Sequence, residues 1–259
     1  MTKPLLNIAI TAARQAGDII LRQSETVEHL KVSEKSSGDF FCEVDVKAEQ
    51  AIMHSILKAY PDHGFIAEES GTHNPQAEVQ WIIDPLDGTN NYLHGFPFFS
   101  ISIACKIKNQ LEHAVIYDPL RHECFHCSRG EGAKLNDRRI RVSKRTQLTG
   151  AILSAGFPSR RKDLIPQFLP TWNTLIEKCA GLRRTGSAAL DLAYVASGRL
   201  DGVWLAGFHP WDIAAGSLLI KEAGGMITSH TGDGDYLQKG ELIAANPKIH
   251  KQLLQLVQD

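Results

Sequence analysis

The sequence predicts a mixed α/β fold whose two halves differ in rhythm. In the N-terminal half, apolar residues alternate through three short runs, Phe99–Ile107, Leu111–Tyr117 and His122–Cys127, separated by turn residues. Such alternation predicts an antiparallel meander. From about Gly150 onward, segments with strand and helix periodicity follow one another, which indicates an α/β arrangement.

The N-terminal elements are predicted from apolar spacing and turn residues. A first amphipathic helix is predicted because these apolar residues recur at helical spacing: Leu5, Ile8, Ala9, Ala12, Ala13, Ala16, Ile19 and Ile20. We expect a strand over Val27–Val32 and a polar loop over residues 35–39. A second helix is expected over Val46–Tyr60 with Asp45 as its N-cap, and a short strand over Phe65–Ala67.

In the C-terminal half, strands and helices are expected to alternate. The predicted strands are Ala151–Phe157, Leu182–Arg184, Gly202–Ala206, Met226–Ser229 and Leu242–Ala245. The predicted helices are Leu164–Cys179, Ser187–Ser197, Trp211–Ala223 and a last one capped by Asn246. We expect residues 1–146 and 147–259 to form two closely packed subdomains without a flexible linker.

Composition and charge describe an ordinary globular chain. The 259 residues are 43% hydrophobic and 22% charged. A formal net charge of -1 provides no long-range attraction for nucleic acid or an acidic membrane, so nucleic-acid binding is not indicated. Because the sequence has neither a membrane-spanning apolar run nor a signal-like segment, we expect a cytoplasmic protein.

The cysteines are predicted to be reduced and structural. Five cysteines are an odd number, which argues against a disulfide framework. Cys124 and Cys127 have the spacing of a redox or zinc motif, but residues three apart in a strand point to opposite faces. A structural role for this pair is therefore favoured.

A short apolar strand ends in the segment Trp81–Tyr92, which carries the sequence Asp-Pro-Leu-Asp-Gly-Thr. Because proline restricts the residue before it, the carboxylates of Asp84 and Asp87 and the carbonyl of Leu86 are expected to converge on a hard cation. The N–H groups of Gly88 and Thr89, at the start of a helix, would provide a neighbouring anion site. The alternative is a solvated turn, since Asp, Pro and Gly are common turn residues.

Two further acids occur in matching positions. Glu68 follows the strand Phe65–Ala67, and Asp212 begins an apolar helix. Four carboxylates gathered within a few ångströms repel one another and stay ionised only with cations among them. Oxygen ligands favour Mg²⁺, with Mn²⁺ as a substitute.

The motifs Phe65–Ser70, Trp81–Tyr92 and Trp211–Gly225, with Arg183–Ala189 between the last two, resemble the inositol monophosphatase family and most closely its bacterial branch. The resemblance covers essentially the whole chain. It implies a layered α-β-α-β-α sandwich, a homodimer, and Mg²⁺-dependent hydrolysis of a small phosphorylated alcohol such as inositol 1-phosphate or a related sugar phosphate.

The resemblance also implies residue roles. One Mg²⁺ is expected on Glu68, Asp84 and the Leu86 carbonyl, a second on Asp84, Asp87 and Asp212, and a third, weaker ion near Glu68. A metal-activated water would attack the phosphorus, oriented by Glu68 and by Thr89 with Asp45 behind it. The residues expected to bind phosphate or substrate are Asp87, Gly88, Thr89, Ser187, Ala188 and Leu205.

Substrate choice is the least determined part of the prediction. Inositol-specific relatives carry an acid at the position of Leu205, so a nucleotide or fructose bisphosphate substrate is an alternative. Further candidates near the site are Lys35, Asp39, Arg184 and His209, the last with a role at a helix start as its alternative. Bacterial relatives also imply a second kind of function, protein binding in transcription antitermination, alongside catalysis.

Overall fold

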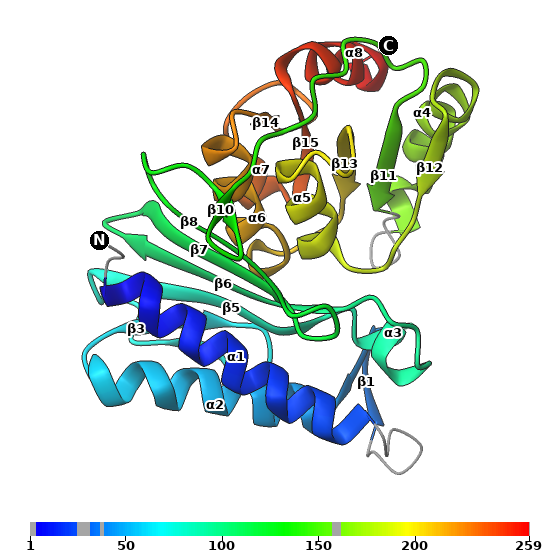
Figure 1. Ribbon diagram of the computed structural model, residues 1–259. Helices are drawn as coiled ribbons and strands as arrows, with labels where there is room; N and C mark the ends of the chain where they lie inside the picture. The colour runs from blue at the N-terminus through cyan, green and yellow to red at the C-terminus, as the bar shows by residue number, and fades with distance from the viewer. Residues whose placement is uncertain (1–3, 25–31, 37–38, 157–161, 259) are drawn as a thin grey trace.

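The computed structural model describes residues 4–24, 32–36, 39–156 and 162–258, and of these residues 32–36, 39–41 and 167 by backbone alone. The chain forms five layers of helices and sheets (Figure 1). The helices of the layers are α1 (Pro4–Ser24) and α2 (Glu43–Ala59), then α5 (Ala188–Ala196) and α6 (Pro210–Glu222), then α4 (Ile165–Lys178) and α8 (Pro247–Gln258). The layered sandwich predicted from the family resemblance is confirmed.

The larger sheet has eight strands in the order β10-β9-β8-β7-β6-β5-β3-β4. Their bounds are β3 (Gly64–Ala67), β4 (Gly71–His73), β5 (Val79–Asp87), β6 (Ser100–Ile107), β7 (Gln110–Asp118), β8 (Glu123–Ser128), β9 (Lys134–Leu135) and β10 (Arg138–Arg139). Strands β6, β7 and β8 pair antiparallel, as the alternating sequence predicts, whereas β3 pairs parallel with β5.

The smaller sheet has five strands in the order β12-β11-β13-β15-β14. Their bounds are β11 (Ile152–Gly156), β12 (Gly181–Arg183), β13 (Gly202–Ala206), β14 (Met226–Thr228) and β15 (Glu241–Ala245). The first three of these strands in space run parallel, and β15 is antiparallel to both its neighbours. The strands and helices predicted for this half are confirmed, with ends shifted by one or two residues.

Three apolar clusters lie between the layers. One face of the larger sheet packs on α1 and α2, with Trp81 and Tyr92 fully buried. The other face packs on α5 and α6, which also cover the smaller sheet. The outer face of the smaller sheet packs on α4 and α8, where Phe168 stacks on Trp204 at 3.7 Å between ring centroids. Cys124 and Cys127 lie in different clusters, and all five cysteines are free, as expected for structural thiols.

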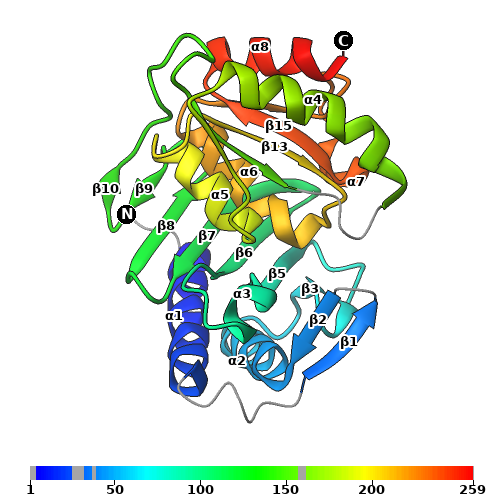
Figure 2. The same ribbon diagram turned by 90° about the vertical axis from the view of Figure 1, so that its right-hand side faces the viewer.

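Some predicted boundaries near the N-terminus are wrong. Helix α2 begins at Glu43, with Cys42 as its N-cap and Asp45 at its third position. Of the loop expected over residues 35–39, Lys35 and Ser36 belong instead to β1 (Val32–Ser36) and Asp39 to β2 (Asp39–Cys42), while residues 37–38 lie outside the described residues. The two strands pair antiparallel beside α2 (Figure 2). The expected strand Val27–Val32 falls largely on residues 25–31, outside the described residues.

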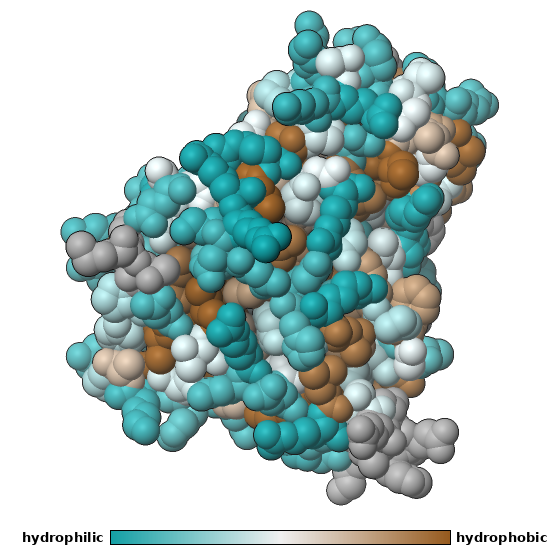
Figure 3. Space-filling view, viewed as in Figure 1, coloured by the Kyte–Doolittle hydropathy of each residue, from teal (hydrophilic) through white to brown (hydrophobic). Residues whose placement is uncertain are grey.

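Hydrophilic side chains cover most of the face shown in Figure 3, with apolar residues scattered between them. Among the described residues, Phe96 and Ile176 are the most exposed large apolar side chains, at 54% each. Within the described ranges, no helix has an apolar stretch long enough to cross a bilayer.

Candidate active site

The end of β5 forms a corner that brings two acids to one side. Strand β5 continues through Asp84 to Asp87 with an irregular register against β6. Asp84 Oδ1 accepts a hydrogen bond from the Leu86 N–H at 3.1 Å. Gly88 has a φ of +102°, and a Cβ there would lie 3.0 Å from the Phe98 carbonyl, so the corner favours glycine. The short helix α3 (Thr89–Leu93) follows, as predicted.

This corner opens on a cavity of about 200 Å³ between the two halves of the chain. The four predicted acids line this cavity: Glu68, Asp84, Asp87 and Asp212. The lining also includes predicted residues of the corner and of the start of α5, namely Leu86, Gly88, Thr89, Ser187 and Ala188. Side chains that are far apart in sequence therefore share one depression. It has room for a small organic phosphate or several waters.

The buried acids perturb one another. Burial raises the pKa of Asp84 well above its usual value, and the charges of Glu68, Asp87 and Asp212 raise it further. Burial also raises the pKa of Asp87 to about 6, while hydrogen bonds from Ser187 and the Ala189 N–H act in the opposite direction. The cluster thus disfavours full ionisation unless positive charge is present.

Asp87 also joins the corner to α5. Its Oδ2 accepts hydrogen bonds from Ser187 Oγ at 2.5 Å and from the Ala189 N–H at 2.7 Å, and its Oδ1 accepts from the Ala188 N–H at 3.3 Å. A carboxylate at this position satisfies N–H groups that a helix start leaves without partners.

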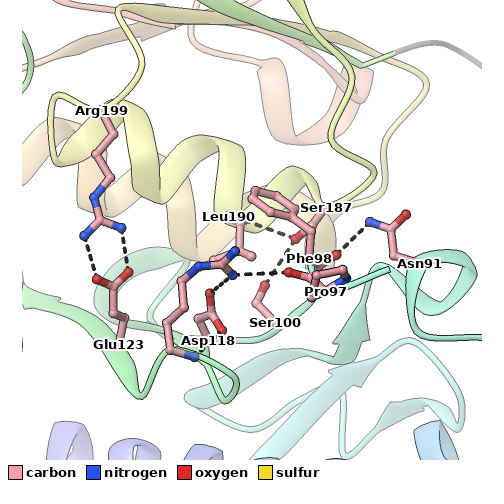
Figure 4. Close-up of polar contacts among 10 residues, drawn as sticks. Asn91, Pro97, Phe98, Ser100, Asp118, Glu123, Ser187, Leu190 and Arg199 are labelled. Atoms are coloured by element: carbon pink, nitrogen blue, oxygen red, sulfur yellow. Dashed lines mark hydrogen bonds and ion pairs between the residues drawn. The ribbon is translucent and has the colours of Figure 1, made fainter. Parts of the chain in front are cut away.

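The two ends of α5 are both fixed to the larger sheet (Figure 4). At its start, Ser187 Oγ lies 3.4 Å from Ser100 Oγ of β6. Just beyond its end, both terminal nitrogens of Arg199 donate to the carboxylate of Glu123 in β8. The arginine also stacks over the ring of Tyr194, 4.8 Å from its centroid. The helix that carries one wall of the cavity is therefore held in place at both ends.

Thr89 lies between the cavity and a buried acid. Its hydroxyl is 2.9 Å from Asp45 Oδ1 and 3.0 Å from the Leu86 carbonyl, and it donates its single proton to one of them at a time. Asp45 is fully buried, and its Oδ2 accepts from the Cys42 N–H at 2.8 Å. Burial raises the pKa of Asp45, while its hydrogen bonds from Cys42 and Thr89 act in the opposite direction. The position of Asp45 behind Thr89 agrees with the resemblance.

Glu68 lies on the turn after β3, and a buried residue of α2 holds that turn. The carboxylate of Glu49 accepts hydrogen bonds from the N–H groups of Glu69 and Ser70, both at 2.8 Å. The Glu68 N–H donates to the Ile83 carbonyl of β5 at 3.2 Å. The backbone on both sides of Glu68 is thus fixed.

Comparison with known proteins agrees with this geometry. The model of the inositol monophosphatase family matches the chain over residues 1–259. The chain belongs to the inositol monophosphatase family. Members of the family generally depend on Mg²⁺.

Named relatives within the family are similar over nearly their whole length. The Nus factor SuhB of Pseudomonas aeruginosa is 49% identical over 261 residues, which cover 99% of this chain and 96% of that protein. The crystal structure of extragenic suppressor protein suhB from Bartonella henselae has a TM-score of 0.97 at 39% identity and covers 99% of each chain. The inositol monophosphatase of Anabaena has a TM-score of 0.85 at 36% identity, covering 98% of this chain and 95% of that one.

The donor set fits the divalent cation of this family in its chemistry. The candidate ligands are carboxylate and carbonyl oxygens, which Mg²⁺ prefers, and the mutual repulsion of the buried acids is relieved by positive charge. In the described part of the chain, however, no three Asp, Glu, His or Cys side chains are spaced to hold a metal. Asp87, predicted as a ligand of the second ion, accepts hydrogen bonds from the start of α5.

The remaining predicted residues have different outcomes. Arg184 lines the cavity and its neighbour Arg183 does not, as expected of adjacent residues that point apart. His209 is the N-cap of α6, where its N–H donates to Asp212 Oδ2 at 2.6 Å, and it is absent from the described cavity lining. The side chains of Lys35 and Asp39 lie outside the described part of the structure.

The structure does not bring Leu205, which was expected to bind substrate, to the described cavity lining. Leu205 is fully buried in the middle layer, among the apolar residues that pack on α5 and α6. It lies in β13 opposite Gly156, and it is absent from the described lining of the cavity. An apolar side chain at this position gains more from the core than from a polar cavity.

Sequence reasoning missed several lining residues. They are Asn90, Asn91, Ala155, Gly156, Thr185, Gly186, Asp191, Gly207 and Phe208. Asp191 is 3% exposed, and burial raises its pKa to about 7. The available signal was that Asp191 is the one charged residue within the otherwise apolar helix Ala188–Ala196.

Proposed function

We propose that this protein is a Mg²⁺-dependent phosphatase that hydrolyses a small phosphate monoester by attack of water. The observation that carries the proposal is the convergence of Glu68, Asp84, Asp87 and Asp212 on one cavity beside the Thr89 and Asp45 pair. The chemistry that bound Mg²⁺ supplies is neutralisation of phosphate charge and activation of water. Glu68, Asp84, Asp87, Asp212 and the Leu86 carbonyl would hold the ions.

The side chains of this chain orient the water and the phosphate. When Thr89 donates its proton to Asp45, the hydroxyl oxygen keeps lone pairs that accept a hydrogen bond from a water in the cavity. Glu68 provides a second acceptor for that water. The N–H groups of Gly88 and Thr89 at the start of α3 favour an anion, which supports binding of the phosphate at this corner. Together these groups align water and phosphorus for displacement.

The substrate we propose is a phosphorylated alcohol, either inositol 1-phosphate or a related sugar phosphate. The cavity supports a nucleotide or a fructose bisphosphate as alternatives, because Leu205 lies in the core and leaves no carboxylate at the position of the hydroxyl-binding acid. Measuring kcat/KM with Mg²⁺ for inositol 1-phosphate, fructose 1,6-bisphosphate, adenosine 3',5'-bisphosphate and NADP distinguishes these classes. Hydrolysis of none of the four would argue against the proposal.

The Asp87→Asn variant tests the role of the acid cluster. The asparagine oxygen still accepts from Ser187 and the Ala189 N–H, so we expect the fold to be kept. Loss of one negative charge from the cation site should lower kcat/KM by at least about a hundredfold. Asp62→Asn, at an exposed position, is the matched control. Wild-type activity of Asp87→Asn would remove this residue from the site.

A second role is proposed because relatives at 47–49% identity are named Nus factor SuhB. We infer that the chain also binds proteins of the transcription antitermination machinery, and that it forms a homodimer as family resemblance implies. Capture of the same partners from lysate by wild type and Asp87→Asn would support a role independent of catalysis. Light scattering measures the molar mass in solution and so tests for the homodimer.

A further inference from the structure

One wall of the cavity is an irregular segment that lacks its own regular hydrogen bonding. The segment Arg184–Ser187 joins β12 to α5, and all four of its residues line the cavity. Gly186 has a φ of +91°, in the region that favours glycine. A loop with glycine loses conformational entropy when it adopts one arrangement, so contacts from other elements must hold this wall.

Asp191 provides such contacts from one turn inside α5. Its Oδ1 accepts a hydrogen bond from Thr185 Oγ1 at 2.8 Å, and its Oδ2 accepts one from Ser154 Oγ at 2.6 Å. Ser154 belongs to β11 and is 1% exposed. A single buried carboxylate therefore connects the cavity wall to α5 and to the smaller sheet.

The other side of Thr185 is held by the N-terminal half of the chain. Asn91 Nδ2, from α3, donates to the Thr185 carbonyl at 2.8 Å and to the Phe98 carbonyl at 2.7 Å. Figure 4 shows the Asn91 amide pointing toward the backbone at Phe98. A Cβ at Gly186 would lie 2.7 Å from Asn91 Nδ2, so the two elements are in close contact. Thr185 is thus fixed through its hydroxyl and through its carbonyl.

We propose that Asp191 is a positioning residue for substrate: by fixing Thr185, it holds the Arg184–Ser187 wall where the alcohol portion of the phosphate ester binds. The inference rests on the proposed phosphatase function and extends it to the cavity wall formed by residues 184–187. Asp191 itself acts through Thr185, and the hydrolytic step remains with the acids and Thr89. Its loss should therefore weaken substrate binding and leave the chemical step largely intact.

The decisive variants each change one of the two groups on the Cβ of Thr185. Thr185→Val removes the hydroxyl that donates to Asp191, whereas Thr185→Ser retains it. With the ester that wild type hydrolyses best, Thr185→Val should raise KM about tenfold and change kcat by less than about threefold. Thr185→Ser should stay within about twofold of wild type in both constants. Thr174→Val, whose hydroxyl donates to a carbonyl of its own helix α4, is the control for the Thr to Val change.

A purely structural role for Asp191 predicts a different pattern. In that case, Thr185→Val and Thr185→Ser would lower the melting temperature and would change the kinetic constants by similar factors. Amide hydrogen exchange at Gly186 and Ser187 gives a readout that needs no turnover. We expect faster exchange there in Thr185→Val and in Asp191→Asn, with exchange in the strands of both sheets unchanged.

The possible results separate this inference from the function on which it rests. An unchanged KM in Thr185→Val, or an equal shift in Thr185→Ser, would overturn the positioning role while wild type stays active. Absence of hydrolysis by wild type would reject the proposed function. In that case, unchanged exchange at Gly186 and Ser187 in Thr185→Val would overturn the positioning role as well.

Discussion

Thr89 occupies the position where a single hydroxyl connects a buried carboxylate to the cavity. Asp45 has no solvent exposure, and it also accepts a hydrogen bond from the N-cap residue of α2. When Thr89 donates its hydroxyl proton to Asp45, the lone pairs of its oxygen remain for a water. Because this arrangement needs the hydroxyl and not the methyl group, substitution at one atom tests it.

Thr89→Val should lower kcat by about a hundredfold or more, because the variant has no oxygen to accept a proton from the attacking water. KM should change little, since the backbone N–H groups of the corner remain. Thr89→Ser keeps the hydroxyl and should retain most of the activity. Steady-state kinetics of the two variants is the measurement, and equal loss in both would show that the methyl group matters instead.

Asp191 gives a prediction for the pH dependence of stability. Burial raises its pKa from 3.8 to about 7. Between these pH values the folded protein keeps the Asp191 proton that the unfolded chain releases, and binding of this proton stabilises the folded state. This contribution to the free energy of unfolding decreases as the pH rises and is lost above about pH 7. Asparagine stays neutral at every pH. In EDTA, the melting-temperature deficit of Asp191→Asn relative to wild type should be larger at pH 5 than at pH 8, and an equal deficit would contradict the assignment.

Among the elements, the turn after β3 shows how a helix positions a candidate ligand. Both oxygens of Glu49 in α2 accept backbone N–H groups from the two residues after Glu68. Glu49 is itself 2% exposed, so its carboxylate depends on these N–H groups in place of water. The direction of the Glu68 side chain therefore depends on a residue that never touches the cavity.

Glu49→Gln replaces one acceptor oxygen with an NH₂ group that faces an N–H donor. We expect a loss of about 1–3 kcal/mol in the free energy of unfolding. Activity should fall as well, because the Glu68 turn is released. Urea titration and kcat/KM measure the two effects, with the exposed Glu78→Gln as control. A stable variant with reduced activity would still support the positioning of Glu68, whereas a stable and fully active one would not.

Element prediction from sequence succeeded where apolar spacing reports burial on one face. Helix α1 and the meander follow their periodicity because each packs one side on a core. The start of α2 was misplaced because Asp45 resembles an N-cap but lies at the third position, where it accepts the Cys42 N–H. The pairing of β1 with β2 was missed because β1 is mostly polar and neither of these short strands has an alternating apolar pattern.

The candidate acids were predictable because each one ends or begins an element within a recognisable motif. The supporting contacts were not, since they join distant parts of the chain. Asn91 and Thr185 are 94 positions apart, and their hydrogen bond depends on how the two halves pack. The location of Leu205 was not predictable for the same reason: its sequence position matched a substrate contact, whereas its side chain lies in an apolar cluster.

At the scale of the molecule, the acid cluster should make stability depend on divalent cations. A cation that binds the folded state alone stabilises it by mass action, by about 2.7 kcal/mol at a concentration one hundred times its Kd. Mg²⁺ should therefore raise the melting temperature, and EDTA should lower it. Asp87→Asn should reduce the Mg²⁺-dependent increase, which needs no substrate. An identical increase in wild type and variant would place the cation elsewhere.

The central helices α5 and α6 should make the whole chain unfold as one cooperative unit. From Asp212 to Ile220 every residue of α6 is buried, because one side of this helix covers the larger sheet and the other covers the smaller one. If the two halves separate, the apolar face of the larger sheet that packs on α5 and α6 becomes exposed to solvent. A chain cut near residue 147 should therefore aggregate. Trp81 and Trp204, which belong to different sheets and different apolar clusters, should consequently lose their native fluorescence at one shared denaturant midpoint.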